Sequence, residues 1–187
     1  MSYRGKVILL GDAGVGKTSL LARYVDGIFS DEYKQTIGAN FLIKEIDLKH
    51  IINKLNVSQE IKSKIKEKGF SLYFWDIGGQ TDKLFVTEYY FLQAVGAMVV
   101  FNVDKKETFD NLDFWVSKLK ELSGDVPFIL IGNKKDLEDM RQVSSEETKS
   151  KAEQLGVKCF ETSAKFNESV DAAFEYLSVQ ILNNLKA

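Results

Sequence analysis

A glycine-rich segment of eight residues lies between a short apolar run and a stretch with helical spacing, and this arrangement constrains the fold most strongly. The apolar run covers residues 7–10 and the helical stretch covers residues 19–25. The segment between them follows the pattern G-x-x-x-x-G-K-[ST] and consists of Gly11, Asp12, Ala13, Gly14, Val15, Gly16, Lys17 and Thr18. A buried strand that turns tightly into a helix opens a βαβ unit, so the pattern favours a parallel sheet covered by helices.

The same alternation of apolar runs and helical stretches continues along the chain. Residues 97–101 and 128–131 are apolar, and each run precedes a segment with helical spacing. Two more strands are predicted at about residues 41–48 and 70–76. A final helix is indicated by apolar residues three and four positions apart, namely Val170, Ala173, Phe174, Leu177 and Ile181. We therefore expect an α/β fold whose parallel sheet is buried on both faces.

The composition agrees with one domain and excludes several classes of protein. The chain has 187 residues, and its 25 Lys plus Arg against 27 Asp plus Glu do not support a broad nucleic-acid surface. Cys159 and His50 are the only residues of their types, which excludes an internal disulfide and clustered zinc or haem ligands. The apolar runs are too short to span a bilayer. We expect a soluble, monomeric, cytoplasmic protein.

The glycine-rich segment has the chemistry of a phosphate site. Backbone N–H groups that glycines leave accessible can surround a polyphosphate, which also meets the positive end of the following helix. Lys17 would neutralise the β- and γ-phosphates, and the Thr18 hydroxyl would bind Mg²⁺. The alternative is a tight turn with an incidental Lys-Thr pair, which is disfavoured because strand, helix and all four fixed positions are present.

A carboxylate at the end of another strand could complete the metal site. Asp76 follows the apolar residues 72–75 and could reach water bound to Mg²⁺. An aspartate is common at this place for structural reasons too, but the residues that follow, Ile77, Gly78, Gly79 and Gln80, strengthen the interpretation. Gly79 would let its own N–H approach the γ-phosphate without a side chain in the way.

Two polar segments after later strands predict a base site. They are Asn-Lys-Lys-Asp at 133–136 and Thr-Ser-Ala-Lys at 162–165. Asp136 could accept from guanine N1–H and the N2 amino group, whereas adenine would leave the carboxylate unpaired. The Ala164 N–H could donate to O6, and the stems of Lys134 and Lys165 could cover the ring. An isolated N-K-x-D is usually a turn, but a phosphate loop upstream favours the base site.

In this order, the motifs resemble those of the Ras-like small GTPases, and residues 88–90 and 109–112 resemble Rab-type members most. The resemblance covers nearly the whole chain except residues 50–69. It implies a P-loop NTPase G domain over residues 1–187, with three αβα layers and a mostly parallel six-stranded sheet that has one antiparallel edge strand. It also implies GTP and GDP as substrate and product, with Mg²⁺ as cofactor.

The resemblance assigns roles by position. Residues 29–38 look like the family's first switch, in which Phe29 would lie edge-on to guanine, Tyr33 would close over the phosphates and Thr36 would contact Mg²⁺ and γ-phosphate. Gln80 would position the attacking water, with Lys17 and Thr36 also catalytic. The metal residues would be Thr18, Thr36 and Asp76. The nucleotide-binding set would be Asp12, Ala13, Gly14, Val15, Gly16, Lys17, Thr18, Ser19, Phe29, Tyr33, Thr36, Gly79, Asn133, Lys134, Asp136, Leu137, Ser163, Ala164 and Lys165.

The chemistry implied is in-line transfer of the γ-phosphoryl group to water. No arginine lies between Phe29 and Thr36 or near Gln80, and Arg23 lies on the first helix facing elsewhere, so slow turnover accelerated by a partner is expected. Activating, exchange and effector proteins would be the partners, in membrane traffic or signalling. The alternatives are an adaptor that hardly hydrolyses GTP and a P-loop kinase. A P-loop kinase would have a lid rich in arginine, and the three arginines of this chain disfavour it.

Three features depart from the Rab pattern. The second-switch motif has an additional glycine, Gly78, and in this it resembles Arf-like and Rag-like GTPases. Ala13 replaces a glycine or serine close to where a partner's arginine would enter. No cysteine follows Leu185, so no lipid anchor is expected in this chain.

The segment 49–69 is an insertion between the second and third predicted strands. Its six lysines and two glutamates give a net charge of +4 and leave −6 for the rest of the chain. A short surface helix capped by Ser58 is predicted, with Ile61 and Ile65 as its apolar face. A solvated extension of a hairpin is favoured over the alternative, a basic patch near the switches that contacts an anionic membrane weakly or binds an acidic partner.

Overall fold

The computed structural model describes residues 3–32, 34–45, 51–79 and 88–184. Six strands form one sheet in the order β2-β3-β1-β4-β5-β6. Their bounds are β1 Tyr3–Leu10, β2 Ala39–Glu45, β3 Phe70–Ile77, β4 Ala94–Asn102, β5 Phe128–Asn133 and β6 Cys159–Glu161. The edge strand β2 pairs antiparallel with β3, and the other neighbouring pairs are parallel, which confirms the predicted sheet.

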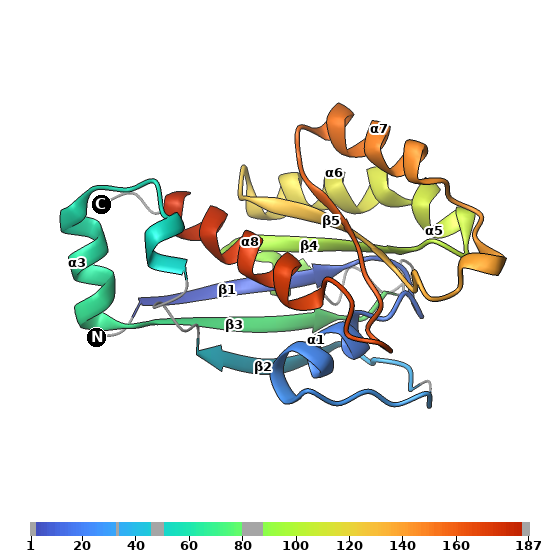
Figure 1. The fold of residues 1–187 in the computed structure, drawn as a ribbon, viewed down its shortest axis with the longest axis horizontal. Coiled ribbons are helices and arrows are strands. Elements are labelled where there is room, and N and C mark those ends of the chain that lie inside the picture. Colours follow the sequence, from blue (N-terminus) through green and yellow to red (C-terminus); the bar gives the residue numbers. More distant parts are fainter. Residues whose placement is uncertain (1–2, 33, 46–50, 80–87, 185–187) are drawn as a thin grey trace.

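Helices cover both faces of this sheet (Figure 1). The α-helices are α1 Lys17–Asp26, α3 Gln59–Lys68, α5 Lys106–Asp110, α6 Leu112–Ser123, α7 Ser145–Leu155 and α8 Val170–Asn184. The short 3₁₀ helices are η1 Ile52–Lys54, η3 Glu88–Phe91 and η4 Glu138–Met140. Helices α1 and α8 lie on one face, and α5, α6 and α7 lie on the other, so the predicted three-layer architecture is confirmed.

The central strand β1 shows why the sheet is buried on both sides. Its side chains alternate between two apolar clusters: Val7 and Leu9 pack with α1 and α8, while Ile8 and Leu10 pack with α6. All four side chains are fully buried. An uninterrupted apolar run is what a strand covered by helices on both faces requires.

The insertion contains the predicted helix. Helix α3 begins after Ser58, whose hydroxyl accepts a hydrogen bond from the Ile61 N–H. Strand β2 ends at Glu45, so part of the strand predicted to run to residue 48 lies outside the described residues. The described part of the insertion runs from residue 51 to 69.

The prediction of a solvated extension was wrong. Ile51, Ile52, Leu55 and Ile65 are between 1% and 5% exposed and belong to the same apolar cluster as α1 and α8. Val57 and Ile61 pack against that cluster as well. The apolar residues before α3, namely Ile51, Ile52 and Leu55, lie three and four positions apart around η1 and supply most of this packing. The apolar side of the segment is part of the core, whereas Lys64, Lys66 and Glu67 on α3 are exposed.

The alternative interpretation, a basic patch near the switches, was wrong about the position of the insertion. Because β2 runs antiparallel to β3, their connection lies at the amino end of β3, next to the start of β1. The phosphate loop, residues 11–18, leaves β1 at its carboxyl end. Figure 1 accordingly shows α3 at the opposite end of the sheet, beside both ends of the described chain. No helix in the described residues is both long and apolar enough to cross a membrane.

Candidate active site

A cavity of about 470 Å³ opens at the carboxyl ends of the strands, at the start of α1. This is the edge of an open α/β sheet at which ligands usually bind. The sequence-predicted residues that line it are Ala13, Gly14, Gly16, Lys17, Thr18, Ser19, Phe29, Thr36, Asp76, Gly79, Asn133, Lys134, Asp136, Leu137, Ala164 and Lys165. Motifs separated by up to about 150 residues therefore share one cavity.

The phosphate loop can take its path only with glycine at two positions. A Cβ on Gly11 would lie 2.1 Å from the Val100 carbonyl oxygen, and a Cβ on Gly16 would lie 2.4 Å from Asn133 Nδ2. Gly16 also has a φ of 93° and precedes α1 without any side-chain cap. The first turn of α1 carries no acidic side chain. Its N–H groups and its positive end are thus available to an anion.

Backbone carbonyls of the phosphate loop hold the Lys17 side chain over the loop. Its side chain is 5% exposed, and Nζ donates to the carbonyl oxygens of Gly11 at 2.7 Å and Asp12 at 2.9 Å. Burial lowers the pKa of Lys17 to about 8, against the opposing influence of the Asp76 and Asp12 charges. A phosphate group beside Lys17 would favour its charged form.

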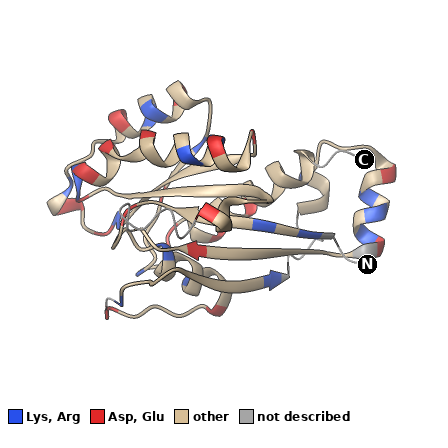
Figure 2. Ribbon diagram, turned by 180° about the vertical axis from the view of Figure 1, so that it is seen from behind, with Lys and Arg blue, Asp and Glu red and all other residues tan. Residues whose placement is uncertain are grey.

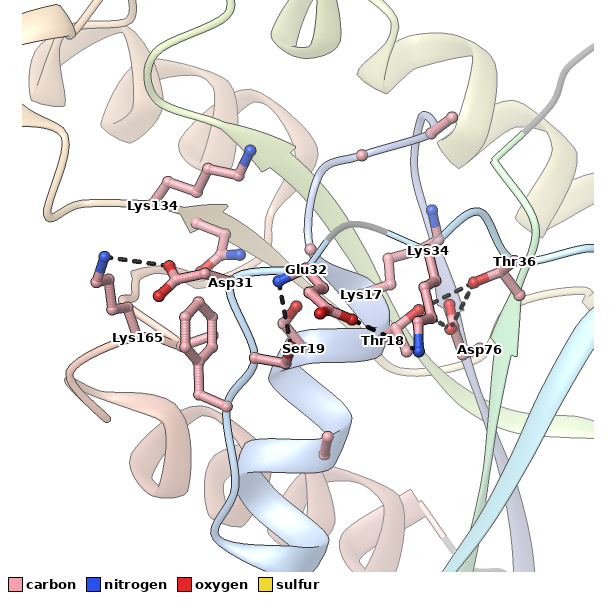
Figure 3. Close-up of a pocket in the computed structure, with 18 of the residues that line it drawn as sticks. Lys17, Thr18, Ser19, Asp31, Glu32, Lys34, Thr36, Asp76, Lys134 and Lys165 are labelled. Carbon is pink, nitrogen blue, oxygen red and sulfur yellow. Dashed lines mark hydrogen bonds and ion pairs between the residues drawn. The ribbon is translucent and has the colours of Figure 1, made fainter.

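Three oxygen-bearing side chains converge at the other side of the loop (Figure 3). The Thr18 and Thr36 hydroxyls lie 3.0 Å apart, Thr36 Oγ1 lies 3.3 Å from Asp76 Oδ2, and Thr18 donates to the same carboxylate oxygen. These are the three residues predicted to hold a metal, and they come from α1, the first switch and β3.

The chemistry of this cluster suits Mg²⁺. Asp76 is fully buried, and its Oδ1 has no hydrogen-bond partner among the described residues. Burial raises the pKa of Asp76, while hydrogen bonds from Thr18 and Thr36 and the charge of Lys17 oppose that shift. A buried carboxylate with an unpaired oxygen and two adjacent hydroxyls is a set of hard oxygen donors, and Mg²⁺ takes its remaining ligands from water and phosphate. The described residues hold no cluster of three or more His, Cys, Asp or Glu side chains.

Gly78 and Gly79, which follow β3, form backbone hydrogen bonds to the first switch and to the phosphate loop near this cluster. The Ala13 N–H donates to the Gly79 carbonyl at 3.1 Å, and the Gly78 N–H donates to the Gly38 carbonyl at 2.8 Å. A Cβ on Gly79 would lie 2.3 Å from the Ala13 nitrogen, and one on Gly78 would lie 2.9 Å from the Thr36 carbonyl oxygen. Gly78, the glycine that departs from the Rab pattern, thus lies directly against the first switch.

The predicted base loops are joined to each other and to the phosphate loop. Asn133 Nδ2 donates to the Val15 carbonyl at 3.0 Å, and its Oδ1 accepts from the Thr162 hydroxyl at 3.1 Å. The Ser163 hydroxyl donates to Asp136 Oδ1 at 2.6 Å and accepts from the Phe166 N–H. The Asp136 carboxylate is therefore held in one orientation at the cavity wall.

Some predicted residues have other positions. Ser163 and Val15 are fully buried, and Asp12 directs its carboxylate towards α6. Asp12 Oδ1 accepts from the Trp115 indole N–H at 2.7 Å, and Oδ2 accepts from Asn111 at 2.8 Å. None of the three is among the described residues that line the cavity, so their side chains support the loops instead. Tyr33 and Gln80 lie outside the described residues.

Sequence reasoning missed two residues. Asn102, at the end of β4, is 1% exposed, and with its amide oriented to satisfy its neighbours it donates to the Val15 carbonyl at 2.9 Å and accepts from Lys134 Nζ at 3.2 Å. Its place after an apolar run, like that of Asp76, was the signal that could have found it. The other is Arg23, which donates to backbone carbonyls of residues 162–165, called the base loop below, and has no such signal.

Comparisons with known proteins agree with this geometry. The model of the Ras family matches residues 6–183. Rab-2B of Dictyostelium discoideum is 38% identical over 183 residues, which cover 97% of this chain and 82% of that protein. The GTP-binding protein ypt2 of Schizosaccharomyces pombe is 38% identical over 180 residues (96% and 82%), and human Rab-8B is 36% identical over 184 residues (98% and 81%). Because the family model spans every loop that lines the cavity, the chain belongs to the Ras family of small GTPases.

Proposed function

We propose that this GTPase is a Rab-like molecular switch that binds GTP and GDP with Mg²⁺, hydrolyses GTP slowly and acts in membrane traffic through partners that distinguish its two states. One observation carries the proposal. Lys17, Thr18, Thr36, Asp76 and Asp136 line a single cavity. Figure 3 shows Lys134 and Lys165 of the two base loops on the opposite side of the cavity from Thr36 and Asp76. That spacing of a phosphate end and a base end fits a nucleotide.

At the phosphate end, groups of the chain itself bind the phosphates and neutralise their charge. Backbone N–H groups of the phosphate loop and the start of α1 hold the β-phosphate, and Lys17 neutralises charge shared by the β- and γ-phosphates. Thr18 and Thr36 would ligate Mg²⁺, and Asp76 would hold it directly or through water. When bound, Mg²⁺ supplies electrostatic stabilisation of the charge on the transferred phosphoryl group.

At the base end, Asp136 provides specificity for guanine. The Ser163 hydroxyl occupies one acceptor position of the carboxylate and fixes its orientation. The remaining lone pairs would accept from guanine N1–H and the N2 amino group. Adenine would leave this carboxylate unpaired, a mismatch that discriminates by roughly 10⁴-fold or more. The Ala164 N–H donates to O6, while Phe29 lies at the edge of the base.

Hydrolysis without a partner is slow in this proposal. Gln80 positions the attacking water, and the γ-phosphoryl group transfers in line from the β-phosphate oxygen to that water. The chain's three arginines are engaged elsewhere: Arg4 lies over Tyr73, Arg23 binds the base loop and Arg141 pairs with Glu161. Without an arginine at the phosphates, turnover of roughly 10⁻⁴ to 10⁻³ s⁻¹ is expected, and an activating protein would raise it.

The switch itself depends on contacts to the γ-phosphate. Thr36 and Gly79 would both bind this group, and they also lie at the meeting point of the three loops. Loss of the phosphate would free both contacts and relax the loops.

Beside these loops lies an exposed apolar surface of Ile37, Phe41 and Ile43, which are 85%, 41% and 50% exposed. Phe41 also stacks on Tyr73 and lies close to Trp75. An apolar patch next to a loop that changes with the nucleotide suits effector, activating and exchange proteins.

The lysine-rich helix supports a weaker, separate contact. Lysines outnumber glutamates along α3 (Figure 2), and each exposed lysine contributes about 1 kcal/mol at an anionic membrane. Since α3 lies at the end of the sheet remote from the cavity, this contact would not depend on the bound nucleotide. Peripheral association with a membrane from the cytoplasm is the location that this proposal implies.

The test is nucleotide extraction followed by turnover. The purified protein should release GDP or GTP on denaturation, and added GTP should be hydrolysed slowly with Mg²⁺ and much more slowly after chelation. A protein that retains guanine nucleotide but shows no Mg²⁺-dependent hydrolysis would instead be an adaptor. Turnover at seconds or faster without a partner would contradict the proposed mechanism.

A further inference from the structure

Arg23 makes three hydrogen bonds to backbone carbonyls from two separate parts of the chain. Nε donates to Ala164 at 2.8 Å, one terminal nitrogen donates to Lys165 at 3.0 Å and the other donates to Gly27 at 2.7 Å. Ala164 and Lys165 belong to the base loop, whereas Gly27 follows the end of α1. The guanidinium therefore joins two walls of the cavity that are more than 130 residues apart in sequence.

The bond to Gly27 fixes how the chain leaves α1. The Gly27 N–H donates to the Arg23 carbonyl at 3.0 Å, so the backbone and side chain of Arg23 both bind this one residue. Gly27 has a φ of 71°, which directs the chain towards Phe29. The Arg23 guanidinium carbon then lies 5.9 Å from the centre of the Phe29 ring, which lines the cavity.

The bond to Ala164 acts on the base loop itself. Ala164 is 3% exposed and lines the cavity, and the proposed donor to guanine O6 is its N–H. With its carbonyl oxygen held by Arg23 and the next carbonyl also bound, the backbone of Ala164 can turn very little. An exposed ion pair between Lys165 and Asp31 joins the same two walls, but such pairs contribute little.

We propose that Arg23 is a positioning residue that holds the base loop against the end of α1, and so sets how slowly the bound nucleotide dissociates. This inference rests on the proposed function, because it takes the base loop as the guanine site. Three donors in one planar group match the three carbonyls. Lysine offers a single ammonium group at this place and would hold the two walls less well.

The experiment compares Arg23→Ala and Arg23→Lys with wild type. Dissociation of GDP in Mg²⁺ is followed with a fluorescent GDP analogue, and the affinities for GDP and 6-thio-GDP are measured by competition. The sulfur of 6-thio-GDP is a weak acceptor, so the ratio of the two dissociation constants reports the Ala164 contact with O6. Arg4→Ala is the matched control, since Arg4 lies on β1 over Tyr73.

Arg23→Ala should raise the GDP dissociation rate about tenfold or more, as expected for lost charge-assisted hydrogen bonds, with Arg23→Lys in between. In Arg23→Ala, the dissociation constant of 6-thio-GDP divided by that of GDP should fall towards 1. Arg4→Ala should match wild type in both measurements. Two results would overturn the inference: dissociation from Arg23→Ala within twofold of wild type, or equal weakening for both nucleotides, which indicates a merely loosened helix. A wild-type ratio already near 1 would count against the proposed contact of Ala164 with O6. Failure of the wild type to retain GDP at all would instead count against the proposed function.

Discussion

The hydroxyl oxygens of Thr18 and Thr36 lie 3.0 Å apart, although they come from the first turn of α1 and from the first switch. Both also contact the Asp76 carboxylate. The cluster draws the first switch onto the phosphate loop through side chains alone. It is the part of the proposed site that mutation can test most directly.

Removing the Thr18 hydroxyl should make nucleotide binding less dependent on Mg²⁺. In Thr18→Ala, GDP should dissociate at least about tenfold faster in Mg²⁺, the equivalent of losing about 1.5 kcal/mol of charge-assisted contact. Chelation should accelerate dissociation much less than in wild type. Thr18→Ser keeps the hydroxyl and is the matched control. Equal responses to chelation in wild type and Thr18→Ala would remove Thr18 from the metal site.

Alanine should be less well tolerated at Gly79 than at Gly78. The new Cβ would lie 2.3 Å from backbone of the phosphate loop at Gly79 but 2.9 Å from the Thr36 carbonyl oxygen at Gly78. Gly79→Ala should therefore reduce GTP affinity relative to GDP affinity more strongly than Gly78→Ala does, as measured by competition binding. The opposite order would show that these loops meet differently once the nucleotide is bound.

Gln80→Leu should separate binding from hydrolysis. The leucine cannot orient water, so GTP affinity should stay near wild type while the single-turnover rate falls by about a hundredfold, the range of a positioned acid-base or water-orienting group. Gln154→Leu makes the same change on the exposed face of α7 and should leave the rate unchanged. A retained rate in Gln80→Leu would assign the water to another residue.

The insertion should contribute to stability. Ile65 is 1% exposed within the main apolar cluster, so Ile65→Ala should lower the free energy of unfolding by about 2–5 kcal/mol in a denaturant titration. Ile37→Ala, at a side chain 85% exposed, is the matched control and should change it by less than about 0.5 kcal/mol. If both variants unfold alike, α3 does not belong to the cooperative core.

The sheet and the shared cavity could be predicted because they follow from local patterns. The glycine-rich loop, Asp76 and the Asn133 segment each come after an apolar strand, and parallel strands bring their carboxyl ends to one edge. Ser58 and the spacing of Ile61 and Ile65 likewise predicted a capped helix within the insertion, which is confirmed.

What could not be predicted depends on partners distant in sequence. The direction of the Asp12 carboxylate is set by Trp115, 103 residues later, and no local spacing encodes that contact. Arg23 binds carbonyl oxygens, which every residue has, so its partners leave no sequence signature. Ile51, Ile52 and Leu55 lie three and four positions apart, but this short run does not itself encode its packing against α1 and α8, so the insertion was predicted to be more exposed than it is.

The antiparallel pairing of β2 with β3 places α3 at the end of the sheet away from the cavity, and the buried Ile65 attaches it to the core. A fluorophore or surface tether attached at the exposed Lys66 would be fixed to the core through Ile65, at the end of the sheet away from the cavity. Such a probe would follow the tumbling and orientation of the whole domain while remaining silent to the chemistry. It would allow single molecules to be immobilised with their nucleotide site facing the solution.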